Sequence, residues 1–395
     1  MQNRNASTHK HLDKSVAWVT PFLGRDGKLM YMEPLLEKLS RNCTKFTAIT
    51  PEYPADINAA PINILVGNGM RRIYWKGKDN YLKGFTFIGP GFLKTITSTK
   101  ADVLFLVEFS MTTIYGILVQ LVNRKTKTIL VMESRPVKNE ELILGFLKKK
   151  LRKFIAKKCD AIITNNRSGR EFLINELDTN PKKIIAKPYL ISYLNQTSAP
   201  NLERFKSLNS ASKINFLYVG RLMQAKGLQY LVDAIKLIPD EYKERMHVDI
   251  VGGGDYRDEL TKYIADNNLS NNFTFHGAVE YSELTKFYGS AHVFIFPTLR
   301  DYRALVPFEA LNAGLPIISS IHDGGVYESV SEGENGYICD PVDITAFSEA
   351  IMKVLSQPEK LYQYSLKSVE MSSEYTLDNA VDNLIEVANL AFSQT

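Results

Sequence analysis

Short apolar runs alternate with amphipathic patterns along the first half of the chain. The apolar runs, rich in Val, Ile, Leu and Phe, predict strands at Val16–Thr20, Phe46–Thr50, Asn63–Val66, Val103–Val107, Thr128–Met132 and Ala161–Thr164. Helical patterns fall between them, for example over Lys28–Arg41 and Glu140–Lys157. This alternation is typical of an α/β domain in which helices cover both faces of a parallel sheet.

The second half repeats the alternation. Its apolar runs predict strands at Asn215–Val219, His247–Val251, Phe273–His276, His292–Phe296 and Ile317–Ser320. The patterns between the strands predict helices at Leu228–Ile238, Tyr256–Asp266, Ser282–Ser290 and Leu305–Ala313. The first of these helices has apolar residues at the spacing i, i+3, i+4, i+7, which places them on one buried face. They are Leu228, Leu231, Val232 and Ile235.

The length of 395 residues suits about two domains at roughly 150 residues each. We predict one Rossmann-like domain over residues 14–190 and a second over 214–373, joined by a Ser- and Asn-rich linker at 191–213. The polar residues 1–13 predict a disordered tail, and residues 374–395 predict a C-terminal helix. Because open parallel sheets bind ligands at the carboxyl ends of their strands, two such domains predict a shared site in a central cleft.

The composition narrows the function classes. The net charge of +5 is too small on its own to indicate nucleic-acid binding. Cys43, Cys159 and Cys339 form no CxxC pair, which indicates a reducing compartment and argues against a zinc site. Residues 1–13 lack the apolar core of a signal peptide, and apolar runs such as 114–122 fall short of the ~20 residues that span a bilayer. We therefore expect a cytoplasmic protein.

The segment from Phe296 to Pro316 carries the strongest chemical signal. A buried strand leads into a polar loop with Asp301, and a helix then follows and stops at Gly314, a residue suited to the position after a helix end. The helix dipole favours an anion at the N–H groups of the first turn, which belong to Ala304, Leu305 and Val306. Asp301 and Glu309 flank this position, eight residues apart (309 − 301 = 8). A phosphate site beside acceptors for sugar hydroxyls is what a nucleotide-sugar site requires.

Loops after other strands of the second half add candidate contacts. Arg221 and Lys226 suit the two charges of a diphosphate, although a solvated loop with two unused cations has the same sequence. Gly253, in the run 252–254, either lets the backbone approach a ligand or makes a tight turn. Residues 322–325, His-Asp-Gly-Gly, form either an anion-binding turn or a surface loop.

The first half offers weaker candidates at the ends of its strands. Gly24 lies in a Gly-Arg-Asp-Gly run after the first strand, and this run covers a phosphate, lines the acceptor cleft or makes a plain turn. Glu108 and Glu133 each follow a buried strand, so both are candidates for contact with the reacting sugar or the acceptor.

Residues 145–158 are strongly basic, with seven cations and no acid. An apolar line along the predicted helix is formed by Leu144, Leu147, Leu151, Phe154 and Ile155. Two interpretations remain open: an interfacial helix on an anionic membrane, or an ordinary core helix with a basic outer face.

Several catalytic motifs are missing. The sequence has no DxD, HExxH, GxSxG or GxxxxGK[ST] motif, and the 252–254 turn lacks the GxGxxG spacing of a dinucleotide site. We therefore expect no metal at the diphosphate, no serine nucleophile and no dinucleotide cofactor.

With these motifs in hand, the second half resembles the retaining glycosyltransferases of family 4, which have the GT-B fold of two Rossmann-like domains. The resemblance covers residues 215–341 in family order, through LYVGRLMQAKGLQYLVDAI, VDIVGGG, FTFHGAV, YSELTKFYGSAHVFIFPT, the Asp301–Glu309 segment, AGLPIISS and DGGVYESVSEGENGYICDP. The first half matches only in pattern, with KKCDAIITNNRSGREFL resembling the segment that closes the family's acceptor domain.

The resemblance implies roles for these residues. Asp301 would contact the donor sugar, Glu309 the ribose hydroxyls, and Arg221 with Lys226 the diphosphate. The phosphate site would be completed by the backbone near Leu305 and Val306, and the base would pack at Val279. The family usually has two glutamates at this spacing and often an aromatic residue or glycine where Arg303 stands. The GT-B fold also implies that the C-terminal helix packs back on the first domain.

The expected function is transfer of a hexose-type sugar from a nucleotide-diphosphate sugar to a glycan or lipid-linked acceptor, with retention and without a metal. Cell-envelope polysaccharide synthesis at the inner face of the membrane is the expected setting, with no nucleic-acid partner. Two alternatives remain: a non-catalytic nucleotide-sugar-binding subunit of a glycan assembly complex, and a GT-B nucleotide-sugar epimerase.

Overall fold

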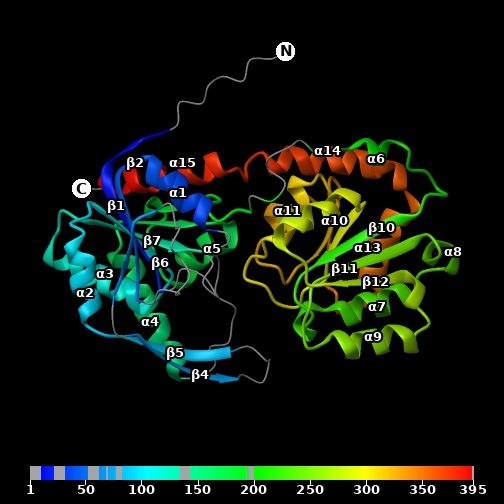
Figure 1. Ribbon diagram of the computed structural model, residues 1–395, viewed down its shortest axis with the longest axis horizontal. Coiled ribbons are helices and arrows are strands. Elements are labelled where there is room, and N and C mark those ends of the chain that lie inside the picture. The colour runs from blue at the N-terminus through cyan, green and yellow to red at the C-terminus, as the bar shows by residue number, and fades with distance from the viewer. Residues whose placement is uncertain are drawn as a thin grey trace, which may run out of the picture. The chain divides into compact units, whose positions relative to one another are not determined.

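The computed structural model describes residues 10–21, 32–51, 62–67, 70–76, 82–133, 143–192, 194 and 200–393. The chain divides into two units, shown in Figure 1. The first unit comprises residues 1–191 and 377–395, and the second comprises residues 192–376. Each unit has its own parallel sheet and its own core, so each is described by itself.

The first unit is built on a seven-stranded parallel sheet in the order β3-β2-β1-β6-β7-β8-β9. The strands are β1 (Leu12–Val19), β2 (Cys43–Thr50), β3 (Ile64–Val66), β6 (Val103–Val107), β7 (Lys127–Met132), β8 (Ala161–Thr164) and β9 (Ile184–Ala186). Every residue of β7 and β8 is buried, as expected for strands covered on both faces. The predicted parallel sheet is confirmed.

Helices cover this sheet. They are α1 (Glu33–Arg41), α2 (Gly91–Ser98), α3 (Met111–Val122), α4 (Ile143–Lys158), α5 (Arg167–Glu171) and α15 (Leu377–Ser393). The C-terminal helix α15 packs against α1, β7 and β8, and Figure 1 shows it beside α1. A contact between Lys187 Nζ and Glu386 Oε1 at 2.8 Å also joins α15 to the end of β9. The last helix therefore belongs to the first unit.

A hairpin in the first unit was not predicted from the sequence. Strands β4 (Met70–Lys76) and β5 (Leu82–Ile88) pair antiparallel and form a separate two-stranded sheet. The other difference is at the start of the chain, where β1 begins at Leu12, inside the segment expected to be a disordered tail. Residues 1–9 of that segment lie outside the described residues.

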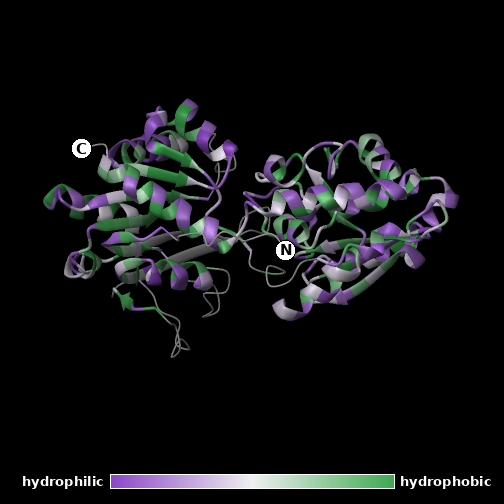
Figure 2. Ribbon diagram, turned by 90° about the horizontal axis from the view of Figure 1, so that it is seen from above, coloured by the Kyte–Doolittle hydropathy of each residue, from purple (hydrophilic) through white to green (hydrophobic). Residues whose placement is uncertain are grey.

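The second unit has a six-stranded parallel sheet in the order β12-β11-β10-β13-β14-β15. The strands are β10 (Ile214–Val219), β11 (Met246–Val251), β12 (Phe273–Gly277), β13 (Val293–Phe296), β14 (Ile317–Ser320) and β15 (Gly336–Cys339). In Figure 2 apolar strands lie between helices that carry polar residues. Because β10 lies between β11 and β13, the loops that follow these three strands leave the same edge of the sheet.

The helices of the second unit lie around this sheet. They are α6 (Glu203–Lys206), α7 (Leu228–Lys236), α8 (Asp240–Lys243), α9 (Arg257–Asp266), α10 (Leu284–Ser290), α11 (Val306–Asn312), α12 (Val326–Ser329), α13 (Ile344–Ser356) and α14 (Leu361–Ser372). The predicted buried face of α7 is confirmed, since all four of its apolar residues are at most 1% exposed. Helix α6 lies in the predicted linker and buries Phe205, so residues 200–213 are part of this unit.

Two predictions from the composition can be compared with the structure. The three cysteines are free and buried, and burial raises the pKa of the Cys43 thiol to about 11. Among the described residues, no helix combines the length and the apolar character needed to cross a bilayer.

Candidate functional site

The loops after β10 and β13 are locked together in the second unit. Gly227 has φ +72°, and a Cβ at this position would lie 1.9 Å from the carbonyl oxygen of Pro297. The backbone N–H of Leu299 donates to the carbonyl of Ala225 at 2.9 Å. A side chain at position 227 would separate the loops, so the glycine allows the close approach that brings Lys226 to the loop after β13.

Lys226 and Asp301 form the central ion pair of this edge. Lys226 Nζ lies 2.5 Å from Asp301 Oδ2, and the two side chains are only 11% and 20% exposed. The ammonium also lies 5.4 Å from the centre of the Phe296 ring. Arg221 is exposed at the start of the same loop, where its carbonyl accepts from the Tyr218 hydroxyl at 3.0 Å. The structure thus brings together Lys226 and Asp301, which the sequence placed in two separate motifs.

Helix α11 ends at the position that Gly314 predicted. It runs from Val306 to Asn312 with Pro307 in its first turn, and Gly314 follows its end with φ +69°. The N–H of Ala304 was predicted to face an anion, but it donates to Asp323 Oδ1 at 3.1 Å. That part of the prediction is corrected, because a carboxylate of the protein itself occupies this donor. Leu305 and Val306 remain at the helix N-terminus, both half-buried.

Asp323 is the site residue that the sequence analysis missed. Its side chain is 1% exposed, and its Oδ1 also accepts from the Gly325 N–H at 3.2 Å. Its Oδ2 has no hydrogen-bond partner in the described part of the chain. Backbone contacts tie it to Asp301, whose N–H donates to the His322 carbonyl at 3.1 Å and whose carbonyl accepts from Gly324 at 3.1 Å.

The charge state of Asp323 follows from this position. Burial, with a contribution from the neighbouring Asp301 charge, raises the pKa of its carboxyl to about 7, although the hydrogen bonds from Ala304 and Gly325 and the charge of Arg303 oppose the shift. The sequence signal for this residue was a polar side chain in the turn after a buried strand. His322 is a surface residue whose Nε2 lies 3.1 Å from Asp340 Oδ1.

Arg303 points into the protein. It is 3% exposed, and its guanidinium carbon lies 4.0 Å from the centre of the Phe308 ring. A Cβ on Gly325 would lie 2.9 Å from Arg303 Cγ, so this glycine provides space for the arginine. Arg303, where the chain departs from the family pattern, therefore packs beside Asp323 and the start of α11.

Glu309 is held by three hydroxyl groups. The Tyr288 hydroxyl donates to Oε2 at 2.7 Å, and the hydroxyls of Ser192 and Tyr281 donate to Oε1, each at 3.0 Å. The carboxylate is 3% exposed, and its burial raises its pKa. These contacts fix the orientation of a side chain that sequence reasoning selected only for its spacing from Asp301.

The turn after β11 lies against the turn after β10. The N–H of Leu222 donates to the carbonyl of Gly253 at 2.9 Å, and Gly252 N–H donates to the Gly277 carbonyl at 2.8 Å. A Cβ on Gly252 would lie 1.9 Å from the Gly220 carbonyl oxygen, which explains the glycine there. Val279 follows Gly277 and is half-buried. Gly253 and Val279 thus share an edge with Arg221.

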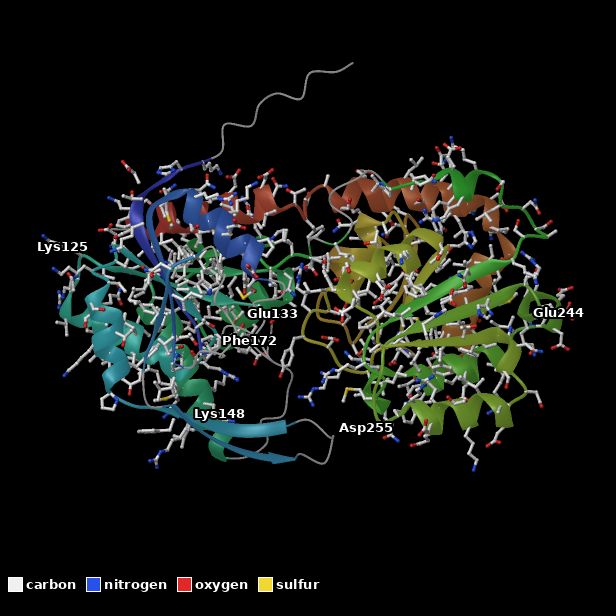
Figure 3. The ribbon with its side chains drawn as sticks, viewed as in Figure 1. Lys125, Glu133, Lys148, Phe172, Glu244 and Asp255 are labelled. Carbon is white, nitrogen blue, oxygen red and sulfur yellow. The ribbon has the colours of Figure 1, made fainter. Side chains whose placement is uncertain are left out.

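The remaining candidates are in the first unit. Glu108 and Glu133 follow the paired strands β6 and β7, and the Glu133 N–H donates to Glu108 Oε1 at 2.7 Å. Figure 3 labels Glu133. Glu108 has a left-handed backbone, with φ +58°, and burial raises the pKa of its carboxyl to about 7. Gly24 lies outside the described residues.

The raised pKa of Asp323 predicts a dependence of stability on pH. The folded state binds a proton that the unfolded state releases near pH 4, so the free energy of unfolding falls as the pH rises from about 4 through about 7. Asp323→Asn keeps the acceptor for Ala304 and Gly325 but does not titrate. We expect it to remove a slope on the order of 1 kcal/mol per pH unit, measured by urea unfolding across this range.

Asp266→Asn is the matched control, because Asp266 is an exposed carboxylate of the same unit. An Asp323→Asn profile parallel to that of the wild-type protein between pH 4 and 7 would contradict the assignment. The comparison also removes the contribution of Glu108, which is common to all three proteins.

One known protein family matches part of the second unit. Residues 201–368 match the sequence profile of the family described as Glycosyl transferases group 1. This stretch lies within the second unit and contains all the candidate residues that meet at its sheet edge, from Arg221 to Asp323.

Curated relatives match part of the chain. An uncharacterized glycosyltransferase of Haemophilus influenzae is 26% identical over 57% of this chain and 60% of its own length. Spore coat protein SA of Bacillus subtilis is 30% identical over 51% of this chain and 55% of its own. The poly(glycerol-phosphate) alpha-glucosyltransferase of Bacillus subtilis is 27% identical over 44% of this chain and 25% of its own. The chain thus spans between 25% and 60% of the length of these relatives.

Solved structures match nearly the whole chain. The Anabaena protein HepE, in complex with UDP, has a TM-score of 0.73 and 13% identity over 95% of this chain and 99% of its own. The sucrose-phosphate synthase of Thermosynechococcus elongatus has a TM-score of 0.71 and 16% identity over 97% and 100%. At these identities the likeness shows the fold. Residues 201–368 thus match the glycosyl transferases group 1 family, and the chain that carries them has the GT-B fold of two Rossmann-like units.

Proposed function

We propose that this protein transfers a hexose-type sugar from a nucleotide-diphosphate sugar to a glycan or lipid-linked acceptor, with retention of configuration and without a metal. The observation that carries the proposal is the Lys226–Asp301 pair, on the same edge of the sheet as Arg221 and within the family-matched sequence. The alpha-glucosyltransferase among the relatives and the UDP complex among the similar structures support this choice of chemistry. Cell-envelope polysaccharide synthesis is the proposed setting.

The diphosphate is assigned to Arg221 and Lys226. Arginine offers forked hydrogen bonds and lysine a point charge, and together they balance the charge that develops when the glycosidic bond breaks. Lys226 is held against Asp301 at 2.5 Å, which keeps its ammonium at this edge of the sheet. The N–H groups of Leu305 and Val306 start α11 and add the positive end of the helix dipole. Two cations and a helix terminus would replace a metal ion here.

The rest of the donor is assigned to the same edge. Asp301 would accept hydroxyls of the transferred sugar, and Glu309 would accept those of the ribose. Gly253 and Val279, on the neighbouring turns, would border the base. Arg303 is turned into the protein, so Asp301 rather than Arg303 is the residue assigned to sugar recognition.

Retention follows from attack on the face that the leaving group occupies. The acceptor oxygen would form a bond to the anomeric carbon as the bond from that carbon to the diphosphate oxygen breaks. The acceptor proton would pass to the departing phosphate oxygen, so no protein nucleophile is assigned. In the first unit, Glu108 and Glu133 are the proposed contacts for the acceptor, since they lie together at the ends of adjacent strands.

A panel of nucleotide diphosphates tests the donor assignment. We expect one of them to stabilise the protein by about 2.7 kcal/mol at a concentration of a hundred times its Kd, measured as a rise in Tm. The corresponding nucleoside, which lacks the phosphates, should give a much smaller rise. In the Lys226→Ala variant, the rise in Tm with the nucleotide diphosphate should be nearly as small as the rise with the nucleoside. The absence of stabilisation by every nucleotide diphosphate would contradict the proposal.

Turnover assays separate the alternatives. A transferase consumes the donor only when an acceptor is present, whereas an epimerase converts the donor sugar alone. A non-catalytic subunit binds the nucleotide but releases no free nucleoside diphosphate with any acceptor. Chromatography of the donor with and without cell-envelope glycans distinguishes the three.

A further inference from the structure

Helix α4 presents its large apolar side chains to solvent. Phe146 is 61% exposed, Leu147 57%, Leu151 44% and Phe154 48%. The described residues of α4 that are buried are mainly small, namely Gly145, Ile155 and Ala156. The sequence left two interpretations of residues 145–158 open, and in a core helix Leu147, Leu151 and Phe154 would be covered. The exposure of Leu147, Leu151 and Phe154 does not fit a core helix, whereas Ile155 of the same predicted line is buried in the core of the first unit.

Cations are interleaved with the exposed apolar side chains. Lys150 Nζ lies 4.5 Å from the centre of the Phe146 ring, and Lys158 Nζ lies 5.9 Å from that of Phe154. Lysines at these positions keep their ammonium groups in water while their stems follow the apolar surface. Leu147, Leu151, Phe154 and Lys158 follow the i, i+4, i+7, i+11 spacing of one helix face.

The acidic side chain that contacts the lysines of α4 balances only part of their positive charge. Lys153 and Lys157 contact Asp178 Oδ2 at 3.2 and 3.1 Å, and the Asp178 side chain is itself 71% exposed. On the inner side of the helix, Arg152 lies beside Phe109 and close enough to Glu108 to lower its pKa. Among the described residues, Lys153 and Lys157 therefore share one carboxylate, out of six cations other than Arg152. We call residues 146–158 the α4 face.

The chemistry of the α4 face identifies its partner. Aromatic and leucine side chains in open solvent are unfavourable, and a patch of them indicates a surface that binds something. A second copy of the same face would bring fourteen cations together, twice seven, against the electrostatic complementarity that interfaces show. A nucleic acid would match the lysines but not Leu147 and Leu151. An anionic lipid surface matches both, because headgroups meet the lysines and acyl chains meet the apolar side chains.

We propose that α4 docks the protein on an anionic membrane surface, with Phe146, Leu147, Leu151 and Phe154 inserted below the headgroups and the lysines among the phosphates. Figure 3 labels Lys148, one of the exposed cations of this helix. The helix lies in the membrane plane and does not span it. Docking needs neither donor nor turnover, so it stands or fails separately from the proposed transferase activity.

Vesicle co-sedimentation with the full-length protein tests the proposal. The probes are phosphatidylcholine vesicles with and without about a third of phosphatidylglycerol, a composition that gives a net negative surface. We expect binding to the anionic vesicles at least tenfold tighter than to the neutral ones, and weaker binding as salt is raised. Phe146→Ser with Phe154→Ser should reduce anionic binding at least tenfold, and so should Lys149→Glu with Lys150→Glu.

Val122→Ser is the matched control, because Val122 is 89% exposed on α3, outside the α4 face, and should leave binding unchanged. Urea unfolding of each variant establishes that it is folded before its binding is compared. Equal binding to both vesicle types, or no loss in the phenylalanine variant, would overturn the proposal. So would a dimer or a DNA complex that the same variants abolish while vesicle binding persists.

Discussion

Lys226→Ala is expected to lower kcat/KM for sugar transfer by about ten- to a hundredfold, and Arg221→Ala to do the same. Each removes a charge-assisted contact to the diphosphate worth roughly 1.5–3 kcal/mol, and each 1.4 kcal/mol is a factor of ten in rate. The contact strengthens as the glycosidic bond breaks, so kcat falls as well as donor affinity. Initial rates at several donor concentrations measure both quantities.

The pairing with Asp301 complicates the lysine variant. Removing Lys226 leaves Asp301, which is 20% exposed, without the cation at 2.5 Å. Part of the loss therefore comes from an uncompensated carboxylate. A double-mutant cycle with Asp301→Asn separates the two contributions, because the interaction between the residues appears as the departure from additivity.

Lys236→Ala is the control for a lysine of the same unit that lies away from the site. Its side chain is 43% exposed on α7 and contacts Asp233 at 3.5 Å. We expect its kcat/KM to remain close to that of the wild-type protein. Near wild-type transfer by both Lys226→Ala and Arg221→Ala would show that the diphosphate binds elsewhere.

The sequence predicted the strands and the helix end that depend on residues close together in the chain. The apolar runs predicted most of the parallel strands within a few residues, because buried strands need continuous apolar sequence. The end of α11 was predicted from Gly314, since φ +69° suits glycine at that position. The loops with Arg221 and Asp301 were predicted to lie at one edge, because each follows a strand of the same parallel sheet.

Long-range contacts decided the features that the sequence did not predict. The burial of Asp323 depends on the backbone of Asp301 and Ala304, about twenty residues earlier. Arg303 turns inward because Gly325 leaves space beside it. Whether the apolar side chains of α4 face the sheet or the solvent depends on which side of the helix packs on the sheet. The amphipathic sequence pattern is the same in both cases.

Glu309 shows the same limit, and it leads to the second large effect. Its hydroxyl partners come from two separate segments, with Tyr281 and Tyr288 on one and Ser192, 117 residues away, on the other. Its spacing from Asp301 suggested a role but not these contacts. The carboxylate therefore has two functions to separate: it holds the second unit together, and it is the proposed acceptor for the ribose hydroxyls.

Glu309→Ala is expected to destabilise the second unit by on the order of 3 kcal/mol or more, because three hydroxyls lose their acceptor and at least one, that of Tyr288, is fully buried. Glu309→Gln keeps the size and one acceptor oxygen, so it should fold with a smaller loss. Its kcat/KM for donor should nevertheless fall about a hundredfold, since a neutral amide cannot accept both a tyrosine and the ribose hydroxyls as strongly. Urea unfolding and donor kinetics measure the two effects.

Tyr288→Phe is the matched control for the structural part of this effect. It removes one hydroxyl bond to Glu309 Oε2 at 2.7 Å and leaves the carboxylate in place. We expect it to lower stability by about 1 kcal/mol and to change donor kinetics much less than Glu309→Gln does. If Tyr288→Phe and Glu309→Gln lost the same amount of kcat/KM, Glu309 would be a structural residue, and the ribose would have to be assigned to another acceptor on the edge of the sheet.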